Sequence, residues 1–378
     1  MEPNSWVDST IAAMTLEQKV GQLFVAYVTG SSADQVSAEN VARFGVGTPA
    51  EAVARFHLGG VIYFAWSGNV STPVQIAALS NGLQRANTVA GGPVPLSIAT
   101  DQETGASVRI GPPASVFPEA IELAAADDPE ATRRTYAIIG RELRAIGITT
   151  DYAPVADVNI NPENPVIGVR SFGADPDLVA RHVAAAVHGL QSAAVSATAK
   201  HFPGHGDTAE DSHTALPVVD HDKEQWARVD APPFRAAVAA GVDAIMTAHL
   251  SFPALDPSGG PATLSREVIN GLLRDELGYS GVIVTDSLRM AGVRTRHPDE
   301  EIPIRAIEAG ADVLLDPPHP DVQIRSVVGA VRGGRLTEQR IDESIRRILI
   351  MKWERGVVEH PYADEAAIDA IFGGRTRG

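Results

Sequence analysis

Residues Ser196–His213 read SATAKHFPGHGDTAEDSH and join a short apolar run to a loop crowded with ionisable side chains. The run Ser196–Lys200 has the length and composition of a buried strand. The loop Lys200–His213 is punctuated by glycine and proline and holds a lysine, three histidines and several acids. Folding alone gives a surface loop no reason to gather such groups. We therefore predict that a strand ends here and that its loop contacts a substrate.

Seven other short apolar runs are each followed by a loop and then by a segment of helical period. The eight predicted strands are Val20–Val28, Gly60–Phe64, Pro95–Thr100, Ile148–Pro154, Ser196–Lys200, Val242–Ala248, Gly281–Thr285 and Ala311–Leu315. Helical segments between them include Pro129–Ile146, Pro176–Ser192, Pro233–Ala240, Ser265–Leu277 and Ile302–Ala309. Strand, loop and helix repeated in this way predict an α/β fold, the closed (β/α)8 or TIM barrel.

The C-terminal ends of the predicted strands carry polar side chains. These are Asp101, Asp157, Lys200, His201, His249, Asp286 and Asp316. Active sites of parallel barrels form at this end of the strands, so these side chains are expected to converge on one mouth. Any one acid here could instead cap the following helix. Their recurrence at six successive strand ends favours the common mouth.

Composition excludes several classes of function. The net charge of −16 argues against a sequence-independent grip on nucleic acid or anionic membrane. The absence of cysteine excludes disulfides and thiolate metal sites. The sequence contains no apolar run long enough to span a membrane, and its start lacks the pattern of a secretion signal. We expect a cytoplasmic monomer, or an exported parent trimmed of its signal.

Four segments together carry a family resemblance. They are DQETGASVR at Asp101–Arg109, IGVRSFGADP at Ile167–Pro176, KHFPGHG followed by DSH within Lys200–His213, and GVIVTDSLRM at Gly281–Met290. In this order they resemble the family 3 glycoside hydrolases, and in particular the NagZ-like β-N-acetylhexosaminidases, from about Met14 to about Gly356. The resemblance implies a single glycosidase domain over residues 1–356 without the second family 3 domain, followed by a C-terminal tail over residues 357–378.

The resemblance also implies the catalytic residues. Asp286 corresponds to the nucleophile that forms a covalent glycosyl-enzyme in a retaining mechanism. His213 corresponds to the acid/base, and Asp211, two residues earlier, orients its imidazole. Because Asp286 loses its charge on esterification, the same ring can first donate a proton and then accept one. Asp286 could alternatively be only the cap of the next helix.

The remaining site residues follow from the same resemblance. Those expected to bind the sugar are Asp101, Arg109, Arg170, Lys200, His201 and Met290. A structural alternative for Arg170 is an ion pair with Asp175 or Asp177. His205 and Asp207 are expected to brace the loop. Thr104 stands where the family usually has glycine, and because a β-branched residue resists positive φ, we predict a reshaped loop there.

The predicted activity is removal of terminal β-linked N-acetylglucosamine from a small carbohydrate, a cell-wall muropeptide or a chitooligosaccharide, with no metal or cofactor. Within the family, a β-N-acetylglucosaminide phosphorylase or a β-glucosidase is the alternative. Outside it, the histidines and acids near His201 could form a metal centre, although the H-x-H pair usual in barrel metal sites is absent. A catalytically silent sugar-binding protein on the same fold is the other alternative.

Overall fold

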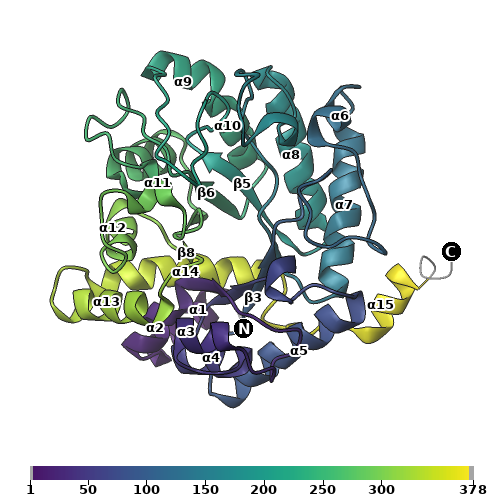
Figure 1. Ribbon diagram of the computed structural model, residues 1–378, viewed down its shortest axis with the longest axis vertical. Coiled ribbons are helices and arrows are strands. Elements are labelled where there is room, and N and C mark those ends of the chain that lie inside the picture. Colours follow the sequence, from purple (N-terminus) through teal and green to yellow (C-terminus); the bar gives the residue numbers. More distant parts are fainter. Residues whose placement is uncertain (1–2, 374–378) are drawn as a thin grey trace.

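The computed structural model describes residues 3–373 and contains one eight-stranded parallel sheet (Figure 1). The strands are β1 (Phe24–Tyr27), β2 (Gly60–Ile62), β3 (Ser97–Thr100), β4 (Thr150–Asp151), β5 (Ser196–Phe202), β6 (Ala244–Thr247), β7 (Val282–Thr285) and β8 (Leu314–Leu315). Their order is β7-β6-β5-β4-β3-β2-β1-β8. A parallel bridge between Val284 and Val313 joins the two ends of this order. The sheet therefore closes into the predicted (β/α)8 barrel.

Helices alternate with the strands along the chain and surround them (Figure 1). Those that follow β1 to β8 in turn are α3 (Ala38–Phe44) with α4 (Pro49–Phe56), α5 (Pro73–Val89), α7 (Pro129–Ala145), α8 (Pro176–Ser192), α10 (Ala231–Ala239), the π-helix η4 (Glu267–Glu276), α12 (Ile302–Ala309) and α13 (Pro320–Arg332). Shorter elements lie in the loops: η1 (Ala65–Ser67), α6 (Ala120–Ala124), η2 (Gly168–Arg170), α9 (Lys223–Val229), η3 (Ala262–Leu264) and α11 (Ala291–Arg294). No helix among residues 3–373 is long and apolar enough to cross a membrane.

The first predicted strand was wrong at its start. Val20 belongs to α2 (Leu16–Gln22), which follows α1 (Pro3–Ala13), and the strand begins only at Phe24. Thr15 caps α2 in a reciprocal capping box with Gln18. This local pairing stabilises the start of the helix, which continues through Val20. A short apolar run does not by itself distinguish a buried helix end from a strand.

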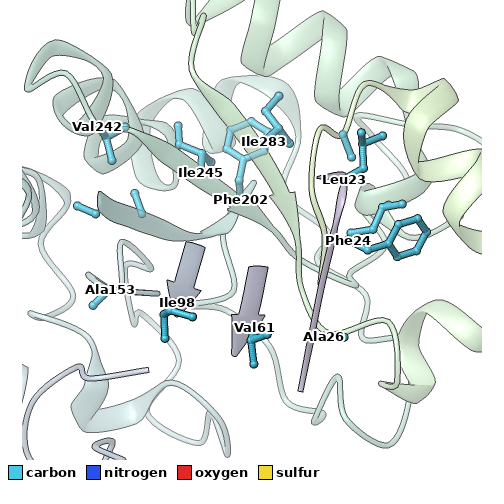
Figure 2. Packing of buried hydrophobic residues seen from close by; sticks show 14 of the residues in the cluster. Leu23, Phe24, Ala26, Val61, Ile98, Ala153, Phe202, Val242, Ile245 and Ile283 are labelled. Atoms are coloured by element: carbon cyan, nitrogen blue, oxygen red, sulfur yellow. The ribbon is translucent and has the colours of Figure 1, made fainter. Parts of the chain in front are cut away.

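The alternation of side chains along each strand divides the core into two layers. On β1, Phe24 and Ala26 point to the helices, as Figure 2 shows for this layer. Val25 and Tyr27 instead lie in the barrel interior, with Ile62, Ala99, Tyr152, Met246 and Val284 among others. Since successive residues of a strand face opposite sides, one buried strand serves both layers.

The last long helix, α14 (Glu338–Glu354), closes the N-terminal end of the barrel. Its Ile348 and Met351 pack into the barrel interior. Its Lys352 is buried and donates hydrogen bonds to the carbonyls of Gly59 and Pro95, both at 2.8 Å, which precede β2 and β3. Burial lowers the pKa of Lys352 to about 7. The opposite end of the barrel is thus the open one.

Residues after the barrel also pack onto it. The helix α15 (Glu365–Phe372) contacts α5 and α7. Ile368 and Phe372 are buried in the same core as the outer face of the strands. The boundary at residue 356 between domain and tail remains a prediction.

Lys352 makes stability depend on pH in a defined direction. Its folded-state pKa of about 7 lies below the ordinary value of 10.5, so between these pH values the unfolded chain binds the proton more tightly. The free energy of unfolding must then rise with pH in this window. We predict that the rise between pH 7 and pH 9.5, measured by urea unfolding, is smaller in Lys352→Met than in the wild type. The exposed Lys223→Met is the matched control and should follow the wild type. Equal rises in all three proteins would contradict the account.

Candidate active site

A cavity of about 530 Å³ lies at the C-terminal mouth of the barrel. The predicted residues that line it are Asp101, Arg109, Arg170, Lys200, His201, His213, Asp286 and Met290. Asp211 does not line the cavity but is bonded to His213, which does. Residues from the ends of β3, β5 and β7, far apart in sequence, therefore meet around one space. Other lining residues include Phe64, Trp66, Glu103, His205, Ser212, Ser287, Arg289 and Asp316.

A buried ion network forms one wall of this cavity. Lys200, on β5, places its ammonium 3.0 Å from Asp101 and 2.8 Å from Glu103. Arg170 binds both oxygens of Glu103, at 2.7 and 2.9 Å. Burial opposes ionisation of Glu103, but Lys200 and Arg170 outweigh it and hold its pKa well below the ordinary range. Burial likewise opposes protonation of Lys200, but the two carboxylates raise its pKa overall. The network is charged at neutral pH and offers fixed donors and acceptors.

Glu103 was not predicted as a site residue. Arg170 pairs with Glu103 and not with Asp175 or Asp177, the acids considered as its alternative partners. Asp175 instead caps α8 by accepting from the amide of Asp177. The available signal was spacing: Glu103 follows Asp101 by two residues, which directs both side chains to one side of an extended segment.

The substitution at Thr104 requires no unusual backbone. Thr104 is buried, and positive φ is taken by the next residue, Gly105, at +58°. Arg109, at the end of this loop, lies 3.3 Å from Asp101. The predicted difficulty for a β-branched side chain therefore does not arise at this position.

Asp157, after β4, fixes the start of the loop Lys200–His213. Its fully buried carboxylate accepts hydrogen bonds from the amides of His201 and His205, at 3.1 and 2.7 Å. It also lies 2.7 Å from Nδ1 of His201. A carboxylate at Nδ1 favours the proton on that nitrogen and leaves Nε2 as the ring atom available to a ligand.

The rest of the loop is braced by two other histidines. His205 contacts Thr208 through Nδ1 at 2.8 Å and Ser212 through Nε2 at 3.0 Å. Burial lowers its pKa to about 4, so the ring is neutral. His221 bridges Asp207 and the buried Asp230, at 2.9 and 2.6 Å. His205 and Asp207 thus have the bracing contacts expected of them.

His213 sits on the more exposed part of this loop. Its Nδ1 lies 2.7 Å from Asp211, which also accepts from the His213 amide at 2.8 Å. Burial opposes ionisation of Asp211, but these bonds lower its pKa overall. The His213 carbonyl accepts from the amide of Ala291, at 3.3 Å, which attaches the loop to the segment after β7. The imidazole is oriented by a carboxylate while Nε2 is available to the cavity.

Asp286 follows the last residue of β7, and its amide donates to Thr247 on β6. One carboxylate oxygen accepts from the amide of Ser287 at 2.7 Å. Burial opposes ionisation, but His201 and the Ser287 amide contribute to a pKa below the ordinary value. A partly buried carboxylate with a lowered pKa and an oriented imidazole thus line one cavity. Such a pair can attack a carbon and transfer a proton to its leaving group.

No group of three or more His, Asp or Glu side chains within residues 3–373 is arranged to hold a metal ion. His205 already uses both ring nitrogens on hydroxyl groups. The geometry gives the metal-centre alternative no support.

Known proteins resemble this chain over most of its length. β-Hexosaminidase A of Pseudoalteromonas piscicida is 38% identical over 327 residues, which cover 80% of this chain and 54% of that protein. A β-N-acetylglucosaminidase/β-glucosidase of Cellulomonas fimi is 33% identical over 362 residues, which cover 93% of this chain and 60% of that protein. The chain thus spans little more than half the length of these relatives.

Solved structures agree with the fold. A family 3 β-N-acetylglucosaminidase from Paenibacillus superposes with a TM-score of 0.85 at 46% identity, covering 91% of this chain and 63% of that one. A β-N-acetylhexosaminidase from Beutenbergia cavernae gives 0.80 at 34% identity, covering 90% and 99%. The model of the glycosyl hydrolase family 3 N-terminal domain matches residues 15–351. The chain therefore belongs to glycosyl hydrolase family 3.

Proposed function

We propose that this chain is the catalytic barrel of a retaining exo-β-N-acetylglucosaminidase that acts through a covalent glycosyl-enzyme. The observation that carries the proposal is the presence of an ionised Asp286 and the His213–Asp211 pair around one cavity. Relatives named β-hexosaminidase and β-N-acetylglucosaminidase support the sugar specificity. Muropeptides and chitooligosaccharides are the proposed substrates.

In the first step the Asp286 carboxylate attacks the anomeric carbon, and the bond from that carbon to the leaving oxygen breaks. His213, protonated and held through Nδ1 by Asp211, donates its Nε2 proton to that oxygen. The product of this step is an ester between Asp286 and the sugar.

In the second step water attacks the same carbon, and the ester bond breaks to release Asp286. His213 gave up its proton in the first step, so its imidazole is now neutral and can act as the base. The imidazole takes the proton from the attacking water and returns to its starting state. One residue serves both halves of the cycle.

The ion network explains how a terminal sugar is held. Asp101 retains acceptor capacity, while Lys200 and Arg109 supply donors beside it. Fixed charged partners discriminate strongly, because a sugar that lacks the matching hydroxyl leaves them unpaired. A wall of buried charges on one side favours release of one terminal residue at a time.

The acid role of His213 predicts a dependence on the leaving group. In His213→Ala, kcat/KM for N,N′-diacetylchitobiose should fall by roughly 10²–10⁴, the usual contribution of general acid catalysis. For an aryl N-acetyl-β-glucosaminide with a good leaving group, kcat/KM should change far less, because that oxygen departs without a proton. The exposed His188→Ala on α8 is the matched control. Equal losses on both substrates would exclude the acid role.

Phosphorolysis is a second candidate for the same site. A solved structure described as the β-glucoside phosphorylase BglX superposes with a TM-score of 0.86 at 26% identity. A neutral histidine in the acid/base position repels a phosphate acceptor less than a carboxylate does.

Product analysis separates the two reactions. With a β-N-acetylglucosaminide and millimolar inorganic phosphate, a hydrolase releases only free N-acetylglucosamine, and we expect this result. Accumulation of the sugar 1-phosphate would identify a phosphorylase instead. A higher kcat/KM for aryl β-glucosides than for their 2-acetamido analogues would favour a β-glucosidase, and no turnover of any of these substrates would favour a silent sugar-binding protein.

A further inference from the structure

An exposed aromatic side chain stands at the rim of the cavity. Trp66, in η1 after β2, lines the cavity but is 62% exposed. Its ring stacks on Phe64, with centroids 4.9 Å apart and planes 17° apart, and meets Tyr27 edge-on at 4.7 Å. An exposed tryptophan beside a sugar-sized cavity offers a flat apolar face to a ligand that extends out of it.

The turn that carries Trp66 is held rigidly. Asn69 is fully buried and donates to the carbonyls of Val28 and Gly30, at 3.0 and 2.9 Å. It also accepts a hydrogen bond from the Ser67 hydroxyl. The amide of Gly30 returns a bond to the Ser67 carbonyl at 3.0 Å. The exposed ring therefore stands on a pre-organised turn, so little conformational entropy is lost when a ligand stacks on it.

An exposed guanidinium lies beside this platform. Arg289, three residues after Asp286, is exposed and lines the same cavity. Its Cζ is 5.0 Å from the centre of the Tyr27 ring and 5.8 Å from that of Trp66. No ion pair or side-chain hydrogen bond of Arg289 is seen within residues 3–373. The charge of Arg289 acts on Asp316, but Asp316 accepts a hydrogen bond from Ser287 at 2.9 Å and pairs with Arg43 instead.

The location of Trp66 and Arg289 at the rim of the cavity suits contact with the sugar on the far side of the scissile bond. The buried network that includes Lys200 binds the terminal sugar, and the reacting carbon must lie at Asp286. A second sugar then extends from Asp286 toward the exposed rim, where Arg289 and Trp66 stand. A free guanidinium is a preferred partner for a carboxylate, which it can bind through two parallel hydrogen bonds.

We propose that Trp66 and Arg289 form a leaving-group subsite for a pyranose that carries a carboxylate, with the ring stacked on Trp66 and the carboxylate paired with Arg289. The proposal rests on the glycosidase function proposed above and goes further by selecting an acidic over a neutral leaving-group sugar. It thereby favours cell-wall disaccharides over chitooligosaccharides.

Two disaccharides that differ only in the lactyl ether, the group that carries the carboxylate, provide the test. They are N-acetylglucosaminyl-β-1,4-N-acetylmuramic acid and N,N′-diacetylchitobiose, which lacks the lactyl ether. The wild type should have the higher kcat/KM on the acidic one, and this preference should shrink with added salt. In Arg289→Gln the ratio of the two values should fall by about tenfold or more, as expected for loss of a charge-assisted bond. Arg289→Lys should retain part of the ratio. Arg296→Gln, an exposed arginine outside the cavity lining, should keep the wild-type ratio.

Trp66→Ala tests the platform separately. It should lower kcat/KM on both disaccharides, because each loses the stacking face. Inhibition by free N-acetylglucosamine, which fills only the terminal-sugar subsite, should weaken far less. Equally weakened inhibition would place Trp66 in that inner subsite and overturn the assignment.

Failure of this inference is distinct from failure of the proposed function. Turnover of both disaccharides with a ratio that Arg289→Gln leaves unchanged would overturn the acidic subsite while the glycosidase stands. Phosphate-dependent turnover lost in Arg289→Gln would assign the guanidinium to an acceptor anion instead and also overturn it. Lack of turnover of any β-N-acetylglucosaminide would overturn both proposals.

Discussion

A single buried ammonium, that of Lys200, organises the open end of this barrel. It lies between the carboxylates of Asp101 and Glu103 and so connects β5 to the loop after β3. Lys200 and Glu103 would each be costly to bury alone, and the opposite charges around each one offset the effect of burial on its pKa. Lys200 also contributes to the lowered pKa of Asp286 across the cavity. The proposed binding of a terminal sugar and the lowered pKa of the proposed nucleophile thus both involve the charge of Lys200.

The two proposed catalytic groups are held in contrasting ways. Asp286 is partly buried at the end of β7, whereas His213 stands on a loop whose base is fixed by Asp157 and whose outer part is more exposed. A fixed nucleophile suits attack at one carbon. The His213 loop is joined to the segment after β7 by backbone hydrogen bonds. A position on such a loop suits a residue that must donate a proton to a departing oxygen and then accept one from an incoming water.

Much of this arrangement was predictable from sequence because it depends on local pattern. Apolar runs that alternate with helical segments predicted the barrel, and polar residues at the ends of six of these runs predicted the mouth. The start of β1 was mispredicted because the capping box at Thr15 extends a helix into an apolar run. The pairing of Glu103 with Arg170 and the proximity of Trp66 to Arg289 depend on how loops from different strands meet. That geometry is set by tertiary packing and leaves no periodic signal in the sequence.

The central claim is that Asp286 takes the sugar as a covalent ester, and it is tested most directly by trapping that ester. In His213→Ala, an aryl N-acetyl-β-glucosaminide with a good leaving group should still glycosylate the enzyme, while water attack lacks its base and is slow. Acid quenching during turnover followed by peptide mass mapping should then find one N-acetylglucosaminyl group on Asp286. An adduct on another residue such as Asp316, or inverted stereochemistry in the product of the wild type, would contradict the account.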